Sequence, residues 1–379
     1  MAATTSSDIP REMKAVQVVQ YNEPYAINTV PVPQALGLHG LLVKVGVASY
    51  CHTDSMVRAG IFKATTTLPL TASHEGAGTV VQAGPAAAAS FPPGTRVMCG
   101  LALDPCGACA ECTTGPESER QYCAALAAAG ITVDGFFSAY VRADARTSTR
   151  VPDGVSLLTA APLACAGNTV WRAVAVAGLE PGQWLAVVGA GGGLGHIGVA
   201  FAKALGLRVV GIDARDEGLA LARAGGADVV VDARAGKEAV VAEVQRVTGQ
   251  QLGADATLAL ADADSAAALA CAVTKKHGTV VQVAQPIEVK IPFQELIMRD
   301  IRIRGTMLAS PGESDDMMRF VAEHGIIVTT RPFYGLDSVH ELLAAVEEGT
   351  VKGKAVIVVD EEQIRAEKKL GGEVIDEWD

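Results

Sequence analysis

The chain lacks the long apolar runs of a membrane protein and the basic runs of a nucleic-acid-binding protein. Hydrophobic residues make up 49% of its 379 residues, yet no uninterrupted apolar run approaches the roughly 20 residues of a membrane span. The formal net charge is −11 and no basic stretch offsets it, so most of the surface would repel a polyanion. We therefore expect a soluble protein with a small-molecule partner, and at this length two domains.

The opening stretch MAATTSSDIPREMK has no apolar segment of the kind found in secretion signals. Asp8 and Glu12 also disfavour a transit peptide, so we expect a short mobile tail and a cytoplasmic location. Thiols stay reduced in that compartment, so clustered cysteines indicate metal binding rather than disulfides. The eight cysteines are Cys51, Cys99, Cys106, Cys109, Cys112, Cys123, Cys165 and Cys271.

The spacing of apolar runs predicts an α/β chain with two kinds of domain. Between residues 13 and 150, runs such as GLLVKVGVAS and GAGTVVQAG are broken by Gly and Pro, which is typical of a strand-rich, barrel-like unit. From residue 184, apolar strands (WLAVVGAGGG, RVVGID, ADVVVDA, DATLALA, GTVVQVA) alternate with helical segments, as in a parallel sheet covered on both faces. This alternation predicts the doubly wound, dinucleotide-binding Rossmann architecture.

After residue 300 the alternation stops. The runs IRIRGTML, DSVHELLAAVEEG and GKAVIVVD resemble the first part of the chain, and we expect them to return to the first domain. The predicted boundaries are 1–164 completed by 302–379 for the catalytic domain, and 165–301 for the nucleotide-binding domain. The charged end EEQIRAEKKLGGEVIDEWD predicts a peripheral helix or a loose tail.

A glycine-rich loop, VVGAGGGLGHIG, lies between the first strand and helix of the second domain. A backbone without side chains can approach a pyrophosphate closely, and the helix start offers unpaired N–H groups. Two registers fit the dinucleotide pattern: a literal match at Gly193, Gly195 and Gly198, and a second that uses Gly189, Gly191 and Gly192. A tight turn without a ligand is the alternative explanation.

Asp213 ends the second strand of this domain, 20 positions after Gly193. An acidic side chain there accepts hydrogen bonds from the ribose hydroxyls of NAD and repels the extra phosphate of NADP. NAD is therefore the favoured cofactor. Arg215 keeps NADP as the alternative cofactor, because a guanidinium could bind that phosphate. A solvated side chain at the strand end is the simpler interpretation of Arg215 and is favoured.

Two sets of residues have the composition of a metal site. The stretch DPCGACAEC repeats Cys-x-x-Cys, and with Cys123 downstream it predicts a tetrahedral structural zinc site; a reduced surface thiol cluster is the alternative. A catalytic zinc keeps one position open and needs fewer protein ligands, which Cys51, His74 and Cys165 could supply. Taken singly, each cysteine could be a small buried residue and His74 a satisfied histidine.

Together these motifs resemble those of the zinc-dependent medium-chain alcohol dehydrogenases, in particular the yeast-like members. The resemblance covers about residues 13 to 360 and is carried by CHTD, HEGAG, the three-cysteine loop, PLACAG, GAGGGLG and Asp213, in family order. It implies a GroES-like catalytic domain beside the Rossmann domain, NAD as cofactor and two zinc ions per subunit. It also implies a homodimer or homotetramer.

The resemblance assigns roles to individual residues. Catalytic zinc would be bound by Cys51, His74 and Cys165, with Glu75 behind the metal and able to exchange with its water. Structural zinc would be bound by Cys106, Cys109, Cys112 and Cys123. Asp54 would orient His74, and Thr53 would bond to the alcohol oxygen and pass its proton to the nicotinamide ribose. The cofactor would contact His52, Gly189, Gly191, Gly192, Gly193, Leu194, Gly195, Asp213, Val283 and Lys354.

The implied reaction is reversible hydride transfer between NAD and a primary or secondary alcohol, with zinc activating the substrate oxygen. A polyol or formaldehyde-adduct dehydrogenase would use the same groups and stays open. A zinc-free quinone or enoyl reductase would not need Cys51, His74 and Cys165 together. A non-catalytic relative of the fold, as among crystallins, would not need an intact zinc set and glycine loop.

The chain departs from the family pattern at several positions. Met56 replaces a relay histidine, so the last proton step is expected to run from the ribose to solvent or through His52. Three extra residues separate Cys112 from Cys123, an insertion of the kind that loops tolerate. Ser73 stands where glycine is usual, a change that we expect to be minor. Lys354 replaces an arginine and loses its bidentate geometry toward phosphate.

Aromatic residues are scarce, at 4% of the chain. Phe62 aligns with a pocket-wall aromatic, whereas Leu101 and Ala102 occupy a region where relatives often place another. This composition predicts a pocket wider than an ethanol-specific one, suited to bulkier primary alcohols. Residues expected to be packed without a chemical role are Cys99, His196 and Cys271.

Overall fold

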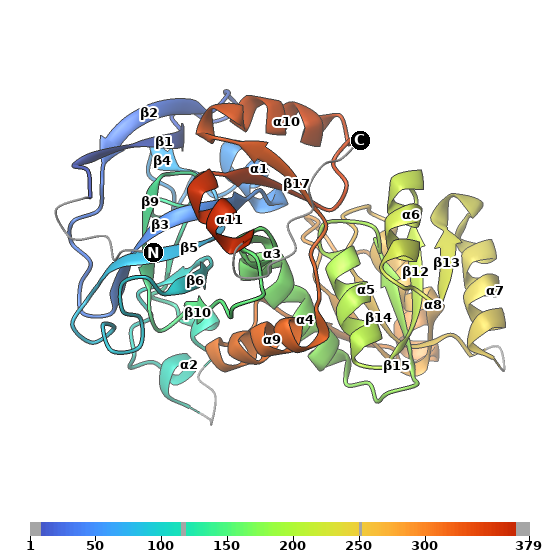
Figure 1. The fold of residues 1–379 in the computed structure, drawn as a ribbon. Coiled ribbons are helices and arrows are strands. Elements are labelled where there is room, and N and C mark those ends of the chain that lie inside the picture. The colour runs from blue at the N-terminus through green and yellow to red at the C-terminus, as the bar shows by residue number, and fades with distance from the viewer. Residues whose placement is uncertain (1–8, 115–118, 250–251, 369–379) are drawn as a thin grey trace. The chain divides into compact units, whose positions relative to one another are not determined.

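The computed structural model describes residues 9–114, 119–249 and 252–368 (Figure 1). The chain forms two compact units, one of Met1–Cys165 with Ser310–Asp379 and one of Ala166–Ala309. The mobile tail expected at the start and the last part of the charged end fall on residues 1–8 and 369–379, outside the described residues. Within the described ranges, no helix has both the length and the apolar character needed to cross a membrane.

The first unit is built on a seven-stranded sheet with the order β10-β6-β5-β3-β18-β17, in which β9 also pairs with β3. Its pairs are antiparallel except for β17 with β18. A three-stranded sheet, β2-β1-β4, and the pair β7-β8 complete it. The strands are β1 (Glu12–Val18), β2 (Ala26–Pro31), β3 (Gly40–Ser49), β4 (Leu70–Thr71), β5 (Glu75–Ala83), β6 (Arg96–Cys99), β7 (Ala102–Leu103), β8 (Ala127–Ala128), β9 (Tyr140–Asp144), β10 (Thr149–Arg150), β17 (Thr330–Tyr334) and β18 (Lys354–Val358).

Strand β3 is apolar on both faces because each face lies against a core. Leu41, Val43 and Val45 belong to the main hydrophobic core of the unit. Leu42, which points the other way, packs in a second cluster with Met13. Successive side chains of a strand alternate between faces, so a strand that is covered twice loses the polar alternation of a half-buried one. The run GLLVKVGVAS therefore marks a central strand.

The helices of the first unit lie around this sheet, and several follow or pack against the strands that lead to the predicted metal ligands. α3 packs against β3 and β5. A turn of π-helix, Leu163–Gly167, follows α3 directly. The α-helices are α1 (His52–Arg58), α2 (Ala110–Thr113), α3 (Leu157–Pro162), α9 (Pro311–His324), α10 (Val339–Glu347) and α11 (Glu361–Lys368), with single 3-10 turns at Arg120–Tyr122 and Leu336–Ser338.

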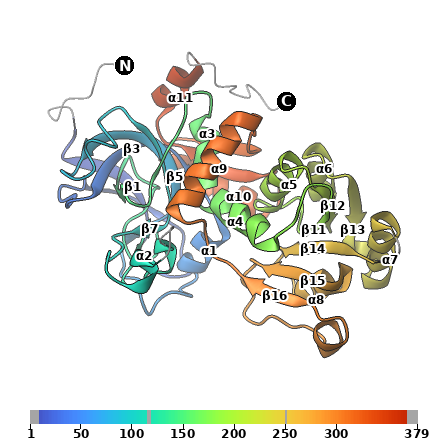
Figure 2. The same ribbon diagram turned by 90° about the horizontal axis from the view of Figure 1, so that it is seen from below.

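The second unit is a six-stranded parallel sheet with the order β13-β12-β11-β14-β15-β16 and helices on its two faces (Figure 1, Figure 2). Its strands are β11 (Trp184–Val188), β12 (Arg208–Asp213), β13 (Val229–Asp232), β14 (Ala254–Ala259), β15 (Thr274–Gln282) and β16 (Arg302–Gly305). Its α-helices are α4 (Asn168–Ala177), α5 (Gly195–Ala204), α6 (Asp216–Ala224), α7 (Lys237–Thr248) and α8 (Ala266–Val273). A 3-10 turn at Ala233–Ala235 and a π-turn at Gln294–Met298 complete the unit.

Two separate cores cover the two faces of this sheet. Trp184, Ala186 and Val188 of β11 pack in one core with residues of α7 and α8. Leu185 and Val187, on the opposite face, pack in the other with residues of α4 and α5. The alternation of apolar strands and helices in the sequence thus becomes a doubly wound parallel sheet. The predicted α/β fold class is confirmed.

The stretch IRIRGTML differs from its sequence prediction. Arg302–Gly305 forms β16, which pairs in parallel with β15 and so belongs to the sheet of the second unit. A four-residue strand with one partly buried apolar side chain carries too little pattern to be assigned to a sheet from sequence. The compact units meet at 165/166 and 309/310, whereas the sequence boundaries were placed at 164/165 and 301/302.

The charged end of the chain begins with a helix that packs on the first unit. Glu367 of α11 is buried, forms an ion pair with Arg96 and accepts a hydrogen bond from the backbone N–H of Leu157 at the start of α3. Gln363 donates a hydrogen bond to the carbonyl of Lys44 in β3. Because both groups are buried, this helix is a fixed part of the unit and its charges have specific partners.

Glu367→Ala should lower the free energy of unfolding by about 3 kcal/mol, since it leaves the Arg96 guanidinium buried without its partner. Glu361→Ala in the same helix removes only an exposed pair with Arg365 and should cost less than about 1 kcal/mol. Urea unfolding followed by circular dichroism measures both. Equal losses in the two variants would show that α11 is not held by its buried charge.

Candidate metal centres and nucleotide-binding turn

Cys51 and His74 come together because two neighbouring antiparallel strands lead to them. β3 ends at Ser49 and β5 begins at Glu75, and these two residues lie opposite each other in the sheet. Cys51 follows the end of one strand and His74 precedes the start of the other. Antiparallel pairing therefore delivers both side chains to the same edge of the sheet.

Cys165 reaches this edge from the π-turn that follows α3. The Ser156 hydroxyl caps the start of α3 by accepting a hydrogen bond from the N–H of Thr159. The turn also lies close to Gly100, just after β6: a Cβ at this position would be 2.6 Å from the carbonyl oxygen of Ala164. Glycine at position 100 permits this close approach.

One carboxylate fixes two of the predicted ligands. Asp54 is the third residue of α1, and its Oδ2 accepts a hydrogen bond from the backbone N–H of Cys51 at 2.8 Å, as in a capping box. Its Oδ1 lies 2.9 Å from Nδ1 of His74. Asp54 is almost fully buried, so neither bond competes with bulk water. The carboxylate thus fixes the backbone of Cys51 and the ring of His74.

The free ring nitrogen of His74 identifies the atom available to a metal. Nδ1 is engaged by Asp54, while Nε2 is buried and has no hydrogen-bond partner among the described residues. The possible ligand atoms of Cys51, His74 and Cys165 lie within 4.8 Å of one another. Zinc bonds to sulfur at about 2.3 Å and to nitrogen at about 2.0 Å, so ligand atoms in a tetrahedral site are roughly 3.5 to 4 Å apart. The three residues fit a zinc ion.

The surrounding charges favour cation binding at this cluster. The Cys165 thiol lowers the pKa of Cys51 well below its ordinary value, against the effect of burial and with help from Lys354 and His74. The same contact, together with burial, raises the pKa of Cys165. Burial alone would lower the pKa of His74, but Asp54 and Cys51 raise it well above the ordinary value. Metal binding would therefore release protons from this cluster.

Glu75 and Lys354 form a buried ion pair beside these ligands. Oε1 of Glu75 accepts hydrogen bonds from Lys354 Nζ and, at 3.1 Å, from the Ser49 hydroxyl. Burial raises the pKa of Glu75 to about 7, and Lys354 opposes this rise. Lys354 also donates to the carbonyl of Tyr50 at 2.8 Å and is only 4% exposed. A buried carboxylate needs a counter-charge, and Lys354 supplies it to Glu75. The expected contact of Lys354 was instead with the cofactor phosphates.

Ser73 occupies a backbone conformation that favours glycine. Its φ is 71°, in the left-handed region, which costs a residue with a Cβ of the order of 1 kcal/mol. Its hydroxyl donates to the carbonyl of Ser49 at 2.9 Å and to that of Glu75 at 3.2 Å. The bond to Ser49 joins the two strands next to the ligands, and the bond to Glu75 is local. The change from the usual glycine therefore adds a cross-strand link at some backbone cost.

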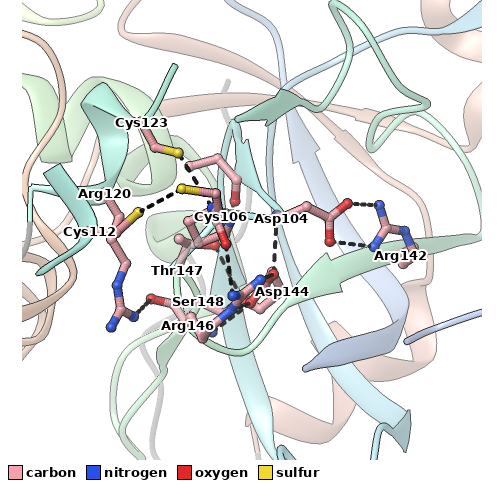
Figure 3. Close-up of polar contacts among 12 residues, drawn as sticks. Asp104, Cys106, Cys112, Arg120, Cys123, Arg142, Asp144, Arg146, Thr147 and Ser148 are labelled. Atoms are coloured by element: carbon pink, nitrogen blue, oxygen red, sulfur yellow. Dashed lines mark hydrogen bonds and ion pairs between the residues drawn. The ribbon is translucent and has the colours of Figure 1, made fainter. Parts of the chain in front are cut away.

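The four other predicted metal ligands also converge. The sulfur atoms of Cys106, Cys109, Cys112 and Cys123 lie within 4.8 Å of one another, and Figure 3 shows three of these cysteines. Sγ of Cys106 and Cys112 are 4.0 Å apart, close to the roughly 3.8 Å between sulfurs of a tetrahedral zinc–thiolate site. Cys123 joins the set despite the longer spacing. Four sulfurs at these separations fit a structural zinc ion.

Backbone N–H groups already point at the sulfur of Cys106. Ala108 and Cys109 donate to it at 3.4 and 3.3 Å. These two N–H groups lower the pKa of Cys106 to about 6, so this thiol ionises readily. Hydrogen bonds from N–H groups stabilise a thiolate whether or not a metal is bound to it. The backbone of the loop thus stabilises the thiolate form of Cys106.

The glycine turn of the second unit has a defined register. Gly189 directly follows β11 with a φ of 88°, which only glycine adopts without strain. A Cβ at Gly191 would lie 2.1 Å from the backbone of Gly218, and one at Gly195 would lie 2.0 Å from the carbonyl oxygen of Gly189. At Gly198 the nearest atom would be 3.8 Å away. The backbone thus requires glycine at 189, 191 and 195 and not at 198.

Asp213 and Arg215 lie beside this turn. Asp213 ends β12, and its Oδ2 accepts a hydrogen bond from the N–H of Gly191 at 2.9 Å. The Arg215 guanidinium is half exposed, with Nε 3.5 Å from Asp213 and Nη2 3.3 Å from the carbonyl of Gly191. Val283 directly follows β15 and donates to the carbonyl of Ala259. The acidic residue expected at the ribose therefore also supports the glycine turn.

The remaining predicted site residues lie at the start of α1. Thr53 Oγ1 is 3.9 Å from Sγ of Cys51, so its hydroxyl lies beside the metal-type cluster. His52 begins the helix and is exposed. Met56, one turn further, is partly buried. Of the residues expected to lack a chemical role, Cys99 and Cys271 are buried in the cores, and His196 Nδ1 contacts the carbonyl of Gly192.

A strand-rich unit with two cysteine-containing clusters that fit zinc, and a doubly wound unit with a dinucleotide-type turn, define a zinc-binding dehydrogenase. Two family models match the chain: the alcohol dehydrogenase GroES-like domain at residues 37–153 and the zinc-binding dehydrogenase at residues 193–323. Both matches agree with the domain types expected from the sequence.

Known proteins match along almost the whole chain. An alcohol dehydrogenase of Geobacillus stearothermophilus is 33% identical over 351 residues, covering 92% of this chain and 100% of that protein. Alcohol dehydrogenase 1 of Emericella nidulans is 33% identical over 358 residues, covering 93% and 99%. The crystal structure of the alcohol dehydrogenase of Aeropyrum pernix superimposes with a TM-score of 0.82 at 29% identity, covering 91% and 99%. The chain belongs to the zinc-dependent medium-chain alcohol dehydrogenase family.

Sequence reasoning missed contacts that come from distant parts of the chain. The ion pair of Lys354 with Glu75 joins residues 279 positions apart, and no local pattern announces it. The capping bond from Cys51 to Asp54 had a visible signal, because an acidic residue three positions after a helix start forms a capping box. The link from Asp54 to His74 was expected, and this signal would have added the link from Asp54 to Cys51.

Asp54→Asn should weaken zinc binding at the Cys51–His74–Cys165 cluster about 10- to 100-fold, since the amide loses the charge that orients His74 and one of two acceptor oxygens. Competition with a chromophoric chelator measures the affinity. Asp153→Asn, at an exposed carboxylate of the same unit, is the matched control and should match the wild type. An unchanged affinity in Asp54→Asn would contradict the assigned contact.

Proposed function

We propose that the protein is a zinc-dependent, NAD-linked alcohol dehydrogenase that transfers hydride reversibly between a primary or secondary alcohol and the nicotinamide. The observation that carries this proposal is the convergence of Cys51, His74 and Cys165 within 4.8 Å, with the buried Nε2 of His74 free of other partners. Three ligands of this kind leave a fourth position for a substrate oxygen. The zinc clusters and the membership of the family support the same activity.

Zinc at this cluster would supply Lewis acidity, which lowers the pKa of an alcohol and polarises a carbonyl. Thr53 lies beside the cluster, and its hydroxyl can accept a hydrogen bond from the alcohol while donating its own proton onward. Asp54 holds the His74 ring so that Nε2 faces the two sulfurs. The Glu75 carboxylate, bonded to Lys354 and Ser49, adds no uncompensated charge to the cluster.

The proton leaves through groups at the start of α1. Met56 offers no titratable group one turn after His52. His52 is exposed, so it can exchange protons directly with water. With a cofactor bound, its ribose would face solvent or His52, and His52 is the exposed titratable group at the start of α1 that would pass the proton to water.

Asp213 supports NAD over NADP as the hydride acceptor. Its carboxylate is held in place by the N–H of Gly191, at the end of the second strand where the ribose of a dinucleotide is bound in this fold. An added phosphate there would meet a fixed negative charge. Gly189, Gly191 and Gly195 shape the turn, and α5 begins at Gly195, where its N-terminus suits a pyrophosphate.

For the substrate, we propose a class of alcohols rather than one compound. Leu101 and Phe62 pack against the main core of the first unit as partly buried residues. The expectation of a wide pocket suited to bulkier primary alcohols stays a prediction. A polyol or formaldehyde-adduct dehydrogenase would use the same ligands, whereas a zinc-free quinone or enoyl reductase would leave them without a role.

We also propose a cytoplasmic homodimer or homotetramer. β16 lies at the edge of the six-stranded sheet. Large apolar side chains are exposed in the segment before it: Ile287, Val289, Phe293, Ile297 and Met298. An exposed sheet edge beside apolar side chains is suited to pairing with a second copy. None of the eight cysteines forms a disulfide, which fits a reducing compartment.

The proposal is tested by zinc analysis together with NADH formation from benzyl alcohol and from ethanol. The wild type should hold two zinc ions per chain and form NADH with either alcohol. Cys165→Ser should lose one zinc ion and at least about 1000-fold in rate, since the site loses a ligand. Cys271→Ser, at a buried cysteine of the other unit, is the control and should keep both. Cofactor binding without NADH formation would instead favour a non-catalytic relative.

Asp213→Asn should raise the ratio of kcat/KM with NADP to that with NAD by about tenfold or more, because it removes a charge worth roughly 1.4 kcal/mol of discrimination and keeps an acceptor for Gly191. Steady-state kinetics with both cofactors measures the ratio. Asp216→Asn, at an exposed acid of the next helix, should leave it unchanged. An unaltered ratio in Asp213→Asn would overturn the assigned role in cofactor choice.

A further inference from the structure

The segment Cys106–Cys123, called the cysteine loop below, is attached at both ends to one short turn. The turn consists of Asp144, Ala145 and Arg146, at the end of β9. Asp104 and Pro105 directly precede the first cysteine of the loop, and Arg120 lies shortly before its last, Cys123. Figure 3 shows Asp104, Arg120, Asp144 and Arg146 near the sulfur atoms of the loop.

Asp144 is a buried carboxylate with four hydrogen-bond donors. Its Oδ2 accepts from the backbone N–H of Asp104 at 3.1 Å and from Nη2 of Arg146 at 2.6 Å. Its Oδ1 accepts from the N–H and Nε of Arg146, each at 2.9 Å. The side chain is 1% exposed, so these bonds are made away from bulk water. The carboxylate is thus saturated by the start of the loop and by Arg146.

Arg146 connects the same carboxylate to the residue before the first cysteine. While Nε and Nη2 bond to Asp144, Nη1 donates to the carbonyl oxygen of Pro105 at 2.8 Å. The carbonyl of Arg146 in turn accepts a hydrogen bond from Nη1 of Arg120 at 3.2 Å. A planar guanidinium makes several such bonds at fixed angles, which an ammonium cannot do. Arg146 therefore holds Pro105 with its side chain and Arg120 with its backbone.

The turn itself is anchored in the sheet of the first unit. Asp144 pairs with Gly40 of β3, the central strand. The Thr147 hydroxyl, one residue after the turn, donates to the carbonyl of Ala102 at 2.5 Å, and so fixes the chain just before Asp104. In its described residues, 106–114 and 119–123, the cysteine loop has the four-residue helix α2 and a 3-10 turn at Arg120–Tyr122, and its first two cysteines are exposed or partly exposed. The loop is positioned by the turn rather than by a core of its own.

We propose that Asp144 and Arg146 are positioning residues for the loop metal: they hold Pro105 and Arg120 at the separation at which the four sulfurs surround one zinc ion. A chelating loop whose ends are fixed loses less conformational entropy when it binds the ion, and it opens less often to release it. The inference rests on the proposed structural zinc of the cysteine loop and is independent of the alcohol dehydrogenase chemistry. Its direct consequence is slow release of the loop zinc.

Zinc release from the full-length, zinc-loaded protein into an excess of a chromophoric chelator tests this inference. The kinetic phase of each metal is identified with Cys112→Ser, which lacks the loop site, and Cys165→Ser, which lacks the other. In Arg146→Gln and Asp144→Asn the loop phase should be about tenfold faster or more, as is typical when a residue that orients metal ligands is lost. The other zinc phase should stay within about twofold of the wild type, since those ligands have their own support in Asp54.

Arg146→Lys separates positioning from charge. The variant keeps the positive charge but cannot bond to Asp144 and Pro105 in the geometry of a guanidinium, so the loop phase should stay as fast as in Arg146→Gln. Recovery of the wild-type rate in Arg146→Lys would overturn the inference. Asp337→Asn, at an exposed acid of the same unit, should release both zinc ions as the wild type does.

A loop phase within about twofold of the wild type in Arg146→Gln would also overturn the inference. This variant decides the matter if Asp144→Asn does not fold, because the Arg146 side chain is partly exposed and its replacement leaves no fully buried cavity. If Cys112→Ser holds as much zinc as the wild type, the structural zinc site itself is refuted. That outcome differs from a normal zinc content with an unchanged release rate in Arg146→Gln, which would refute only the positioning role.

Discussion

Asp54 bonds to the backbone of Cys51 and to the ring of His74, and the activity proposed for this protein depends on that arrangement. The two residues meet because Ser49 lies opposite Glu75 in the antiparallel pair β3 and β5. A shift of one residue in this register would turn every side chain of one strand to the other face. The two apolar cores on either side of β3 therefore fix the register, and with it the metal-type cluster.

Buried charges recur in the first unit, and those named here have a partner. Glu75 is paired with Lys354, Asp144 with Arg146, and Glu367 with Arg96. The pairs of Glu75 with Lys354 and of Glu367 with Arg96 join elements far apart in the sequence, whereas Asp144 and Arg146 belong to one turn. Breaking such a pair costs far more than breaking a surface pair, because one charge stays buried without compensation. The charged pairs near the predicted zinc ligands thus hold the neighbouring segments in place and also set the local electrostatic environment.

The local signals in the sequence were sufficient for the doubly wound sheet, whereas the residues of the two clusters were named from their combination and from the family resemblance. Fully apolar strands such as WLAVV predicted a parallel sheet because both faces of β11 are covered. β16 was assigned to the other domain, since four residues with little apolar pattern do not specify a sheet. The contacts of Lys354 with Glu75 and of Asp144 with the N–H of Asp104 were not predictable, because they join segments that only the folded protein brings together. The glycine register needed the backbone contacts at Gly191 and Gly195.

Anomalous diffraction from crystals of the zinc-loaded protein, recorded on both sides of the zinc absorption edge, tests the central claim most directly. The account predicts a peak bonded to Sγ of Cys51, Nε2 of His74 and Sγ of Cys165, at about 2.3 Å from each sulfur and about 2.0 Å from the nitrogen. A zinc-replete crystal without a peak among these three atoms would contradict it. So would a disulfide between the two cysteines.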